Sequence, residues 1–274
     1  MIPKKIHYCW FSNDPYPDEV KRCLASWHQY MPDYEYILWD SERIKNVDSV
    51  WLRECLEERK WAFAADFIRV YALYQEGGIY LDSDVVVFRS FDDLLDHRFF
   101  IGREECQYAT FDDGVQQFLS GHCFGSEAGH SFLGKLLEYY SGRHFRRTPA
   151  STLPEDLRYD TLMLPYIQSR IAESFGYCPS LNADYLQKLQ EDMVVFPSSY
   201  FGFWRERTPQ TSTYAIHLGQ GSWRDEEYWR KHPPMQQYHY TFRYKIRWRI
   251  VVAMKWIARK LGYVMLKIDK NGYE

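Results

Sequence analysis

The chain has 274 residues, enough to bury one sizeable core, and its net charge of −3 gives no indication of general nucleic-acid binding. Aromatic residues make up 18% of the sequence, which suits either a tyrosine-rich core or a site for the flat faces of sugars and bases. The six cysteines form no C-x-x-C pair and have no regular spacing, so they argue against a zinc site and favour buried reduced thiols.

The first 59 residues alternate between strand and helix patterns. Apolar runs over residues 5–11 and 34–39 predict two buried strands. Residues 17–30 predict a helix with proline in its first turn, and Asp40 begins a polar helical stretch that extends to about residue 59. This alternation predicts a mainly parallel sheet, in which ligands bind beyond the carboxyl ends of the strands.

Residues 61–76 predict an apolar helix at the centre of the fold. Its two charged side chains inside the run, Asp66 and Arg69, are three residues apart and therefore share one helical face. Gly77 and Gly78 follow and end the helix, because glycine accepts the left-handed conformation of a C-cap.

An Asp-x-Asp motif comes directly after the next predicted strand. Asp82 and Asp84 follow the apolar residues 79–81 and precede the apolar residues 85–87. Two carboxylates with this spacing can share a hard divalent cation, Mn²⁺ or Mg²⁺, which keeps open positions for substrate phosphates. A solvated turn is the alternative, but it would interrupt a buried strand. We therefore favour the metal site.

The elements expected after the motif are a helical turn at 91–95, strands at 99–102, 117–125, 194–197 and 213–216, and helices at 130–140 and 160–175. Residues 108–114 read as a loop, either a border of an acceptor site or an ordinary surface loop, and residues 142–159 as an irregular segment. His122 and His130 are candidate ligands, although lone histidines are more often structural.

A glycine-rich loop, His217-Leu218-Gly219-Gln220-Gly221-Ser222-Trp223, follows the last predicted strand. Its two glycines let the backbone approach a bulky ligand, and its histidine and serine offer ligands for a metal or a phosphate. The alternative is a glycine-rich turn with a packed tryptophan.

Residues 236–274 predict a basic helical extension. Within residues 241–270, nine Lys or Arg accompany one acid, and apolar residues recur at helical spacing. Such an amphipathic helix binds either an anionic membrane surface, which we favour, or a protein surface. No uncharged apolar run approaches the length of about 18 residues that a membrane span needs, and the N-terminus has no secretory pattern. We expect a cytoplasmic protein, peripheral on the inner face of the plasma membrane.

Three motifs together resemble the family 32 glycosyltransferases. They are A-A-D-F-I-R-V-Y-A-L followed by G-G-I-Y-L-D-S-D-V, the opening I-P-K-K-I-H-Y-C-W-F, and H-L-G-Q-G-S-W, in family order within about the first 223 residues. This family includes bacterial capsule and polysaccharide enzymes and fungal mannosyltransferases, and it is related to the clostridial glucosylating toxins. The resemblance implies a GT-A catalytic domain over residues 1–235, an α/β fold with a central mainly parallel sheet flanked by helices.

The resemblance also implies roles for individual residues. Asp82 and Asp84 would bind the metal together with His217, and Asp66 and Arg69 would bind the sugar hydroxyls. The residues implied in catalysis are Asp66, Arg69, Asp82 and Asp84. Those implied in donor binding are Tyr8, Trp10, Asp66, Arg69, Tyr80, Asp82, Ser222 and Trp223. For Trp10 a place in the core is the alternative, and for Asp66 with Arg69 a purely structural ion pair.

The function that the resemblance implies is retaining, metal-dependent transfer of a hexose. The donor would be a nucleotide sugar, UDP rather than GDP. The acceptor would be a saccharide that can be linked to polyprenyl diphosphate, in capsule or other surface polysaccharide synthesis. No nucleic-acid partner is expected. Two alternatives are a DxD phosphatase, which normally has its motif on the first strand, and a metal-dependent carbohydrate-binding protein, which would not require the Trp10 strand.

Overall fold

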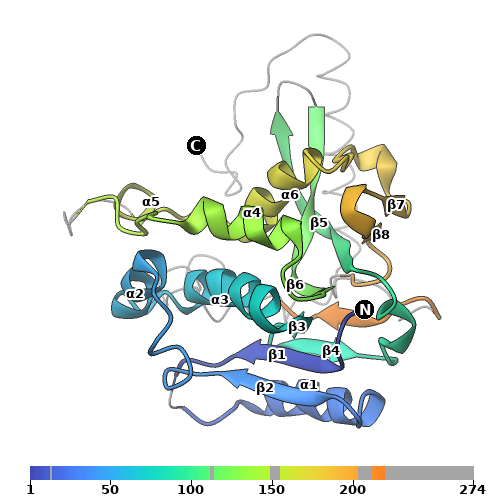
Figure 1. Ribbon diagram of the computed structural model, residues 1–274, viewed down its shortest axis with the longest axis horizontal. Coiled ribbons are helices and arrows are strands. Elements are labelled where there is room, and N and C mark those ends of the chain that lie inside the picture. The colour runs from blue at the N-terminus through green and yellow to red at the C-terminus, as the bar shows by residue number, and fades with distance from the viewer. Residues whose placement is uncertain (13, 112–113, 149–154, 203–210, 220–274) are drawn as a thin grey trace, which may run out of the picture. The chain divides into compact units, whose positions relative to one another are not determined.

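The fold is α/β, as expected, and is built on one central sheet flanked by helices (Figure 1). The computed structural model describes residues 1–12, 14–111, 114–148, 155–202 and 211–219. The expected boundary between residues 235 and 236 and the basic C-terminal helix lie outside these residues. They remain predictions.

Within the described residues the central sheet has seven strands in the order β2-β1-β3-β6-β5-β8-β7. They are β1 (Lys5–Cys9), β2 (Glu35–Trp39), β3 (Gly78–Leu81), β5 (Phe99–Phe111), β6 (Gly114–Ser126), β7 (Gln187–Lys188) and β8 (Met193–Phe196). The pairs β1–β2, β1–β3 and β5–β8 are parallel, and β6 and β7 run against their neighbours. All the other strands of this sheet therefore run in one direction, which makes it mainly parallel.

A second, two-stranded sheet pairs β4 (Val85–Val87) with β9 (Ala215–His217). The helices are α1 (Asp18–Tyr30), α2 (Val50–Glu57), α3 (Trp61–Glu76), α4 (Ser131–Tyr140), α5 (Glu155–Arg158) and α6 (Leu164–Glu173). Single 3₁₀ turns are η1 (Asp92–Leu94), η2 (Leu181–Ala183) and η3 (Gln190–Asp192).

The central sheet has an apolar layer on each face, and β3 shows how the sequence creates both. Ile79 and Leu81 point into the layer that contains Trp27 of α1, whereas Tyr80 points into the layer that contains helix α3. Successive residues of a strand face opposite sides, so a strand that is apolar throughout is buried on both. All four residues of β3 are buried, which confirms the sequence expectation.

Two glycines form the junction between α3 and β3. Gly77 has φ of +64° and Gly78 has φ of +117°, values that glycine adopts without steric cost. A Cβ atom on Gly77 would also lie 2.9 Å from the backbone nitrogen of Ala128. The tight junction directs β3 back under its helix, so the motif that follows β3 lies on the same side of the sheet as Asp66 and Arg69.

Two expectations differ from the structure. Residues 108–114, expected as a loop, are mostly strand, because β5 and β6 form one long antiparallel hairpin with register shifts. The polar stretch expected from Asp40 is helical only in α2, which begins after Ser49. The Ser49 hydroxyl accepts a hydrogen bond from Leu52 N at 3.2 Å and thereby starts a separate helix.

Candidate active site

The Asp-x-Asp motif occupies the turn between β3 and β4. Its backbone is fixed by two hydrogen bonds, from Asp82 N to His122 O at 2.9 Å and from Val85 N to Asp82 O at 3.0 Å. Leu81 and Val85 are fully buried, whereas Asp82 and Asp84 are partly exposed. Both carboxylates therefore lie at the end of a buried strand, at the carboxyl edge of the parallel strands, where α/β folds bind ligands.

His217 joins the two aspartates to form a candidate metal site. The pairing of β4 with β9 sets Val85 opposite His217, and His217 Nε2 lies 3.1 Å from Asp84 Oδ1. One ligand atom from each of Asp82, Asp84 and His217 lies within 4.8 Å of the others. A divalent cation fits this donor set, since carboxylate oxygens suit Mg²⁺ and Mn²⁺ and imidazole is a common metal ligand.

The charge on His217 depends on its carboxylate neighbours. Burial alone lowers the pKa of an imidazole, but the Asp84 carboxylate, helped by Asp82 and Glu104, raises the pKa of His217 to about 9. The metal-free ring is therefore protonated at neutral pH and acts as a cation between the acids. It must release that proton before its nitrogen can bind a metal.

Arg69 connects helix α3 to the motif. Its Nη2 lies 3.2 Å from Asp66 Oδ1 and 3.2 Å from Asp82 Oδ1. The guanidinium also stacks over the Tyr80 ring, 4.6 Å from its centroid, and donates to the carbonyl oxygen of Gly121. Arg69 is only 5% exposed, so these contacts supply the partners that a buried cation requires.

Asp66 sits deeper than the motif. Its Oδ2 accepts a hydrogen bond from Leu164 N, the first residue of α6, at 3.2 Å. Burial raises the pKa of Asp66 to about 6, although Arg69 and the Leu164 N–H favour the ionised form. The structure thus brings Asp66, Arg69 and Asp82 together, and it shows the first two on one helical face, as expected, and joined by an ion pair.

Four aromatic residues are expected at the donor site, and the three that lie within the described residues, Tyr8, Trp10 and Tyr80, have different surroundings. Tyr80 is buried, and its hydroxyl donates to Asp82 Oδ1 at 2.9 Å, so its visible contact is with the motif. Tyr8 and Trp10 are partly exposed. In the parallel β1–β3 pair, His7 lies opposite Tyr80, so Trp10 and Asp82 both lie at the carboxyl ends of these neighbouring strands. Their donor contacts remain predictions, and Ser222 and Trp223 lie outside the described residues.

Two further side chains, those of Glu104 and His122, lie behind the metal site. The sequence does not identify Glu104, whereas it makes His122 a candidate ligand, with a structural role as the more common alternative. His122 Nδ1 lies 3.2 Å from Glu104 Oε1, and both side chains are buried. Burial raises the pKa of Glu104, but His122, His217 and the Gly121 N–H outweigh it and hold that pKa below its usual value. The available signal was two adjacent acids, Glu104 and Glu105, that follow the strand predicted over residues 99–102.

Comparison with known proteins confirms the resemblance for the central region. Residues 17–101 match the family model described as a glycosyltransferase sugar-binding region containing a DXD motif. This region contains Asp66, Arg69 and both motif aspartates. Residues 17–101 are therefore similar to the sugar-binding region of DXD glycosyltransferases, whereas the opening strand and the His217 loop lie outside the match.

Two curated relatives are fungal mannosyltransferases. Inositol phosphoceramide mannosyltransferase 3 of Schizosaccharomyces pombe is 33% identical over 136 residues, which are 48% of this chain and 35% of that protein. Mannosyl phosphorylinositol ceramide synthase SUR1 of Saccharomyces cerevisiae is 32% identical over 142 residues, 50% of this chain and 34% of that protein. The chain thus spans about a third of the length of these relatives.

Two solved glycosyltransferase structures resemble the chain with low TM-scores and low sequence identity. The PaToxG glycosyltransferase has a TM-score of 0.43 at 16% identity, covering 63% of this chain and 69% of its own. The galactosyltransferase LgtC, solved with donor and acceptor sugar analogues, has a TM-score of 0.38 at 12% identity, covering 78% of this chain and 86% of its own.

Proposed function

We propose that this protein is a metal-dependent glycosyltransferase that moves a hexose from a nucleotide sugar to a hydroxyl group of a saccharide. One observation carries the proposal. Asp82, Asp84 and His217 hold their ligand atoms within 4.8 Å of one another, and Asp82 and Asp84 lie inside the matched sugar-binding region. The opposing strands β3 and β6 and the β4–β9 pair fix these residues, so the donor set is formed before a ligand binds.

We assign separate roles to the residues of the site. Asp84 and His217 are direct metal ligands, and Asp82 is a ligand that Arg69 and Tyr80 hold in place. A bound Mn²⁺ or Mg²⁺ neutralises the charge that develops on the leaving diphosphate. Asp66 and Arg69 are proposed to bind hydroxyl groups of the donor sugar.

The stereochemical proposal is retention, which the family resemblance implies. Asp66 and Asp82 each lie 3.2 Å from the Arg69 guanidinium, so both carboxylates are engaged and neither is offered as a covalent nucleophile. We propose that the acceptor hydroxyl attacks from the side of the leaving group, which gives an α-linked product without a glycosyl-enzyme intermediate.

The sugar is a hexose. The curated relatives are mannosyltransferases, which supports mannose as the transferred sugar. The resemblance to bacterial enzymes and toxins supports UDP as the nucleotide of the donor. We propose that Trp10, which is partly exposed at the end of β1 beside the motif, stacks on the base. A panel of donors that differ in sugar and in nucleotide tests both assignments directly.

The acceptor and the location rest on the sequence alone. A basic C-terminal helix supports a lipid-linked saccharide at the inner face of the plasma membrane, in capsule or other surface polysaccharide synthesis. The described residues include no helix that is long and apolar enough to cross a membrane. We propose a peripheral attachment through the C-terminal helix.

A donor panel tests the function. The purified protein is incubated with UDP- and GDP-hexoses in Mn²⁺ or in EDTA, and the released nucleoside diphosphate is measured. Release from one donor in Mn²⁺ and its loss in EDTA are the expected result. A folded protein that binds and hydrolyses none of the donors contradicts the proposal. Release of phosphate from an aryl phosphate would instead indicate a phosphatase.

A further inference from the structure

The proposed metal site is backed by a buried polar pair, Glu104 of β5 and His122 of β6. The two side chains are 3% and 2% exposed, so neither presents an open surface to a substrate. An acid and an imidazole are costly to bury, and a pair of apolar side chains would fill the same place at lower cost. What these residues contact therefore indicates why they are there.

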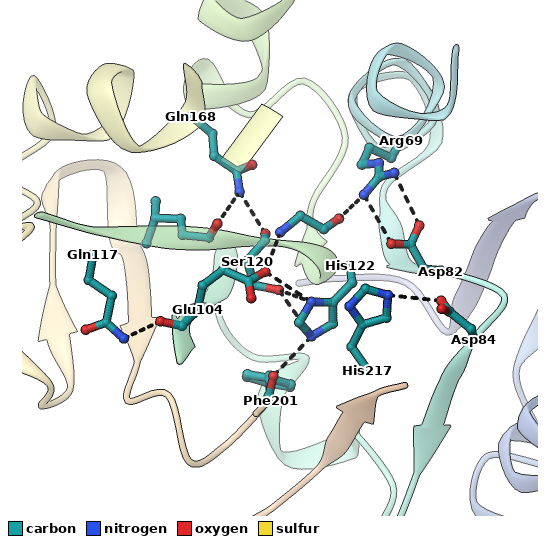
Figure 2. Close-up of polar contacts among 12 residues, drawn as sticks. Arg69, Asp82, Asp84, Glu104, Gln117, Ser120, His122, Gln168, Phe201 and His217 are labelled. Carbon is teal, nitrogen blue, oxygen red and sulfur yellow. Dashed lines mark hydrogen bonds and ion pairs between the residues drawn. The ribbon is translucent and has the colours of Figure 1, made fainter. Parts of the chain in front are cut away.

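The His122 ring is fixed through both of its nitrogens (Figure 2). Nδ1 lies 3.2 Å from Glu104 Oε1 and 3.0 Å from Ser120 Oγ, and Nε2 lies 3.0 Å from Phe201 O. The Glu104 carboxylate is itself fixed, since Oε1 also accepts a hydrogen bond from Gly121 N at 3.3 Å. The plane of the imidazole is consequently set by β5, by β6 and by the backbone at residue 201.

One face of this fixed ring packs on the ligand His217. The two imidazole centroids are 4.5 Å apart and the ring planes differ by 20°, which is a stacked arrangement. Figure 2 shows His122 beside His217, with Asp84 at the far end of the His217 ring. Since Asp84 lies 3.1 Å from Nε2, His217 is held between the His122 ring and the Asp84 carboxylate.

The same segment of β6 also supports the two other charged parts of the site. Gly121 O accepts a hydrogen bond from Arg69, and His122 O accepts one from Asp82 N at 2.9 Å. Helix α6 anchors the segment, because Gln168 Nε2 donates to Ser120 O at 2.7 Å. The backbone on which His122 is mounted is therefore tied to the motif and to Arg69.

We propose that Glu104 and His122 are positioning residues of the metal site: Glu104 fixes the His122 ring, and that ring holds His217 in the orientation in which it can bind the cation beside Asp82 and Asp84. The proposal rests on the metal-dependent function proposed above. It gives a role to buried charge that the DXD motif does not explain. Residues that orient metal ligands typically change metal affinity by about 10- to 100-fold when they are removed.

The test is Mn²⁺ binding, followed by the electron paramagnetic resonance signal of free Mn²⁺ and independent of turnover. His122→Ala removes the wall behind His217 and is expected to weaken binding about tenfold. His122→Phe keeps a flat ring against His217 but loses the hydrogen bonds to Glu104 and Phe201. The two variants lose the same hydrogen bonds. The difference in Mn²⁺ affinity between His122→Phe and His122→Ala therefore measures the contact of the ring with His217.

His130→Ala is the matched control for general loss of stability. His130 is also buried and bonded through both ring nitrogens, to Phe132 N at 3.2 Å and to Glu191 O at 3.1 Å, but it makes no contact with the metal ligands among its described interactions. It should keep the wild-type Mn²⁺ affinity even if its melting temperature falls. A His130 variant that loses affinity as strongly as His122→Ala would overturn the proposal.

Glu104→Gln keeps the shape of the acid and provides a second variant if His122→Ala does not fold. It is expected to weaken Mn²⁺ binding by less than His122→Ala, because it keeps an acceptor oxygen but removes the negative charge. Wild-type affinity in all folded variants at Glu104 and His122 would overturn the positioning role alone. A wild-type protein that binds no Mn²⁺ would instead overturn the proposed function, so the two failures are distinguishable.

Discussion

Arg69 holds Asp82 by two contacts: Nη2 lies 3.2 Å from Oδ1, and Nη1 donates to Oδ2 at 3.5 Å. The Tyr80 hydroxyl donates to the same carboxylate at 2.9 Å. Asp84, two residues later, is paired instead with His217 on β9. The two acids of the motif therefore have different partners, one set by helix α3 and the other by the second sheet.

Replacing Arg69 by lysine should slow donor hydrolysis more than it lowers the stability of the fold. A lysine ammonium cannot reproduce the planar fork that reaches Asp66 and Asp82 together, so the motif carboxylate loses its fixed orientation. We expect a fall of about 100-fold in the rate of donor hydrolysis, the size of effect that a small misplacement produces. Arg53→Lys, an exposed site on α2, is the control and should hydrolyse the donor at the wild-type rate.

The stability of the fold should depend on Asp66 in a defined pH window. Because its pKa is raised to about 6 in the folded protein, Asp66 contributes stability below its ordinary pKa that is lost as the pH rises through 6. Relative to Asp66→Asn, the wild-type free energy of unfolding should fall by roughly 2 kcal/mol from pH 4 to 7. Urea unfolding over this range measures it, and a difference that does not vary with pH would contradict it.

Mn²⁺ affinity should rise with pH through the titration of His217. Its pKa of about 9 means that the proton must leave before the ring binds the metal, so acid favours the metal-free form. From pH 6.5 to 8.5 we expect affinity to increase by up to about tenfold per pH unit. His217→Gln has no proton to lose there and should show a shallower slope. Equal slopes in the two proteins would remove His217 from the site.

Gly121→Ala should test how closely Arg69 packs on β6. An added Cβ atom would lie 3.3 Å from Arg69 Nη1 and 3.2 Å from Pro165 Cγ, tighter than ordinary contact. We expect a loss of about 1–3 kcal/mol in stability together with slower donor hydrolysis. Gly134→Ala in α4 is the matched control, because its Cβ atom would meet Tyr74 Cε2 at 3.5 Å. This helix substitution should raise the melting temperature.

Much of the fold and of the site was predictable because it is encoded locally. Asp66 and Arg69 meet because a helix brings together residues three apart, and both sit on α3. The motif lies at the end of a buried strand because β3 is apolar and the glycines before it end the helix. These relations depend on a few neighbouring residues, and periodicity reveals them.

The Glu104–His122 pair could not be predicted in this way. It depends on how β5 and β6 align, and that hairpin shifts register between Ile101 and Arg103 and again before Tyr108. A shift of one residue would turn Glu104 to the other face. The contact between His122 and His217 further requires β9 to pair with β4, across more than a hundred residues of sequence. Such pairings come from tertiary structure.

The central claim is that Asp82, Asp84 and His217 hold a divalent cation for transfer from a nucleotide sugar. It is tested most directly by comparing donor hydrolysis in Mn²⁺ and in EDTA for the wild type, Asp84→Asn and the exposed-site control Asp96→Asn. We predict hydrolysis that requires Mn²⁺ in the wild type and in Asp96→Asn, and a fall of at least about 100-fold in Asp84→Asn. Equal Mn²⁺-dependent rates in all three folded proteins would contradict the claim.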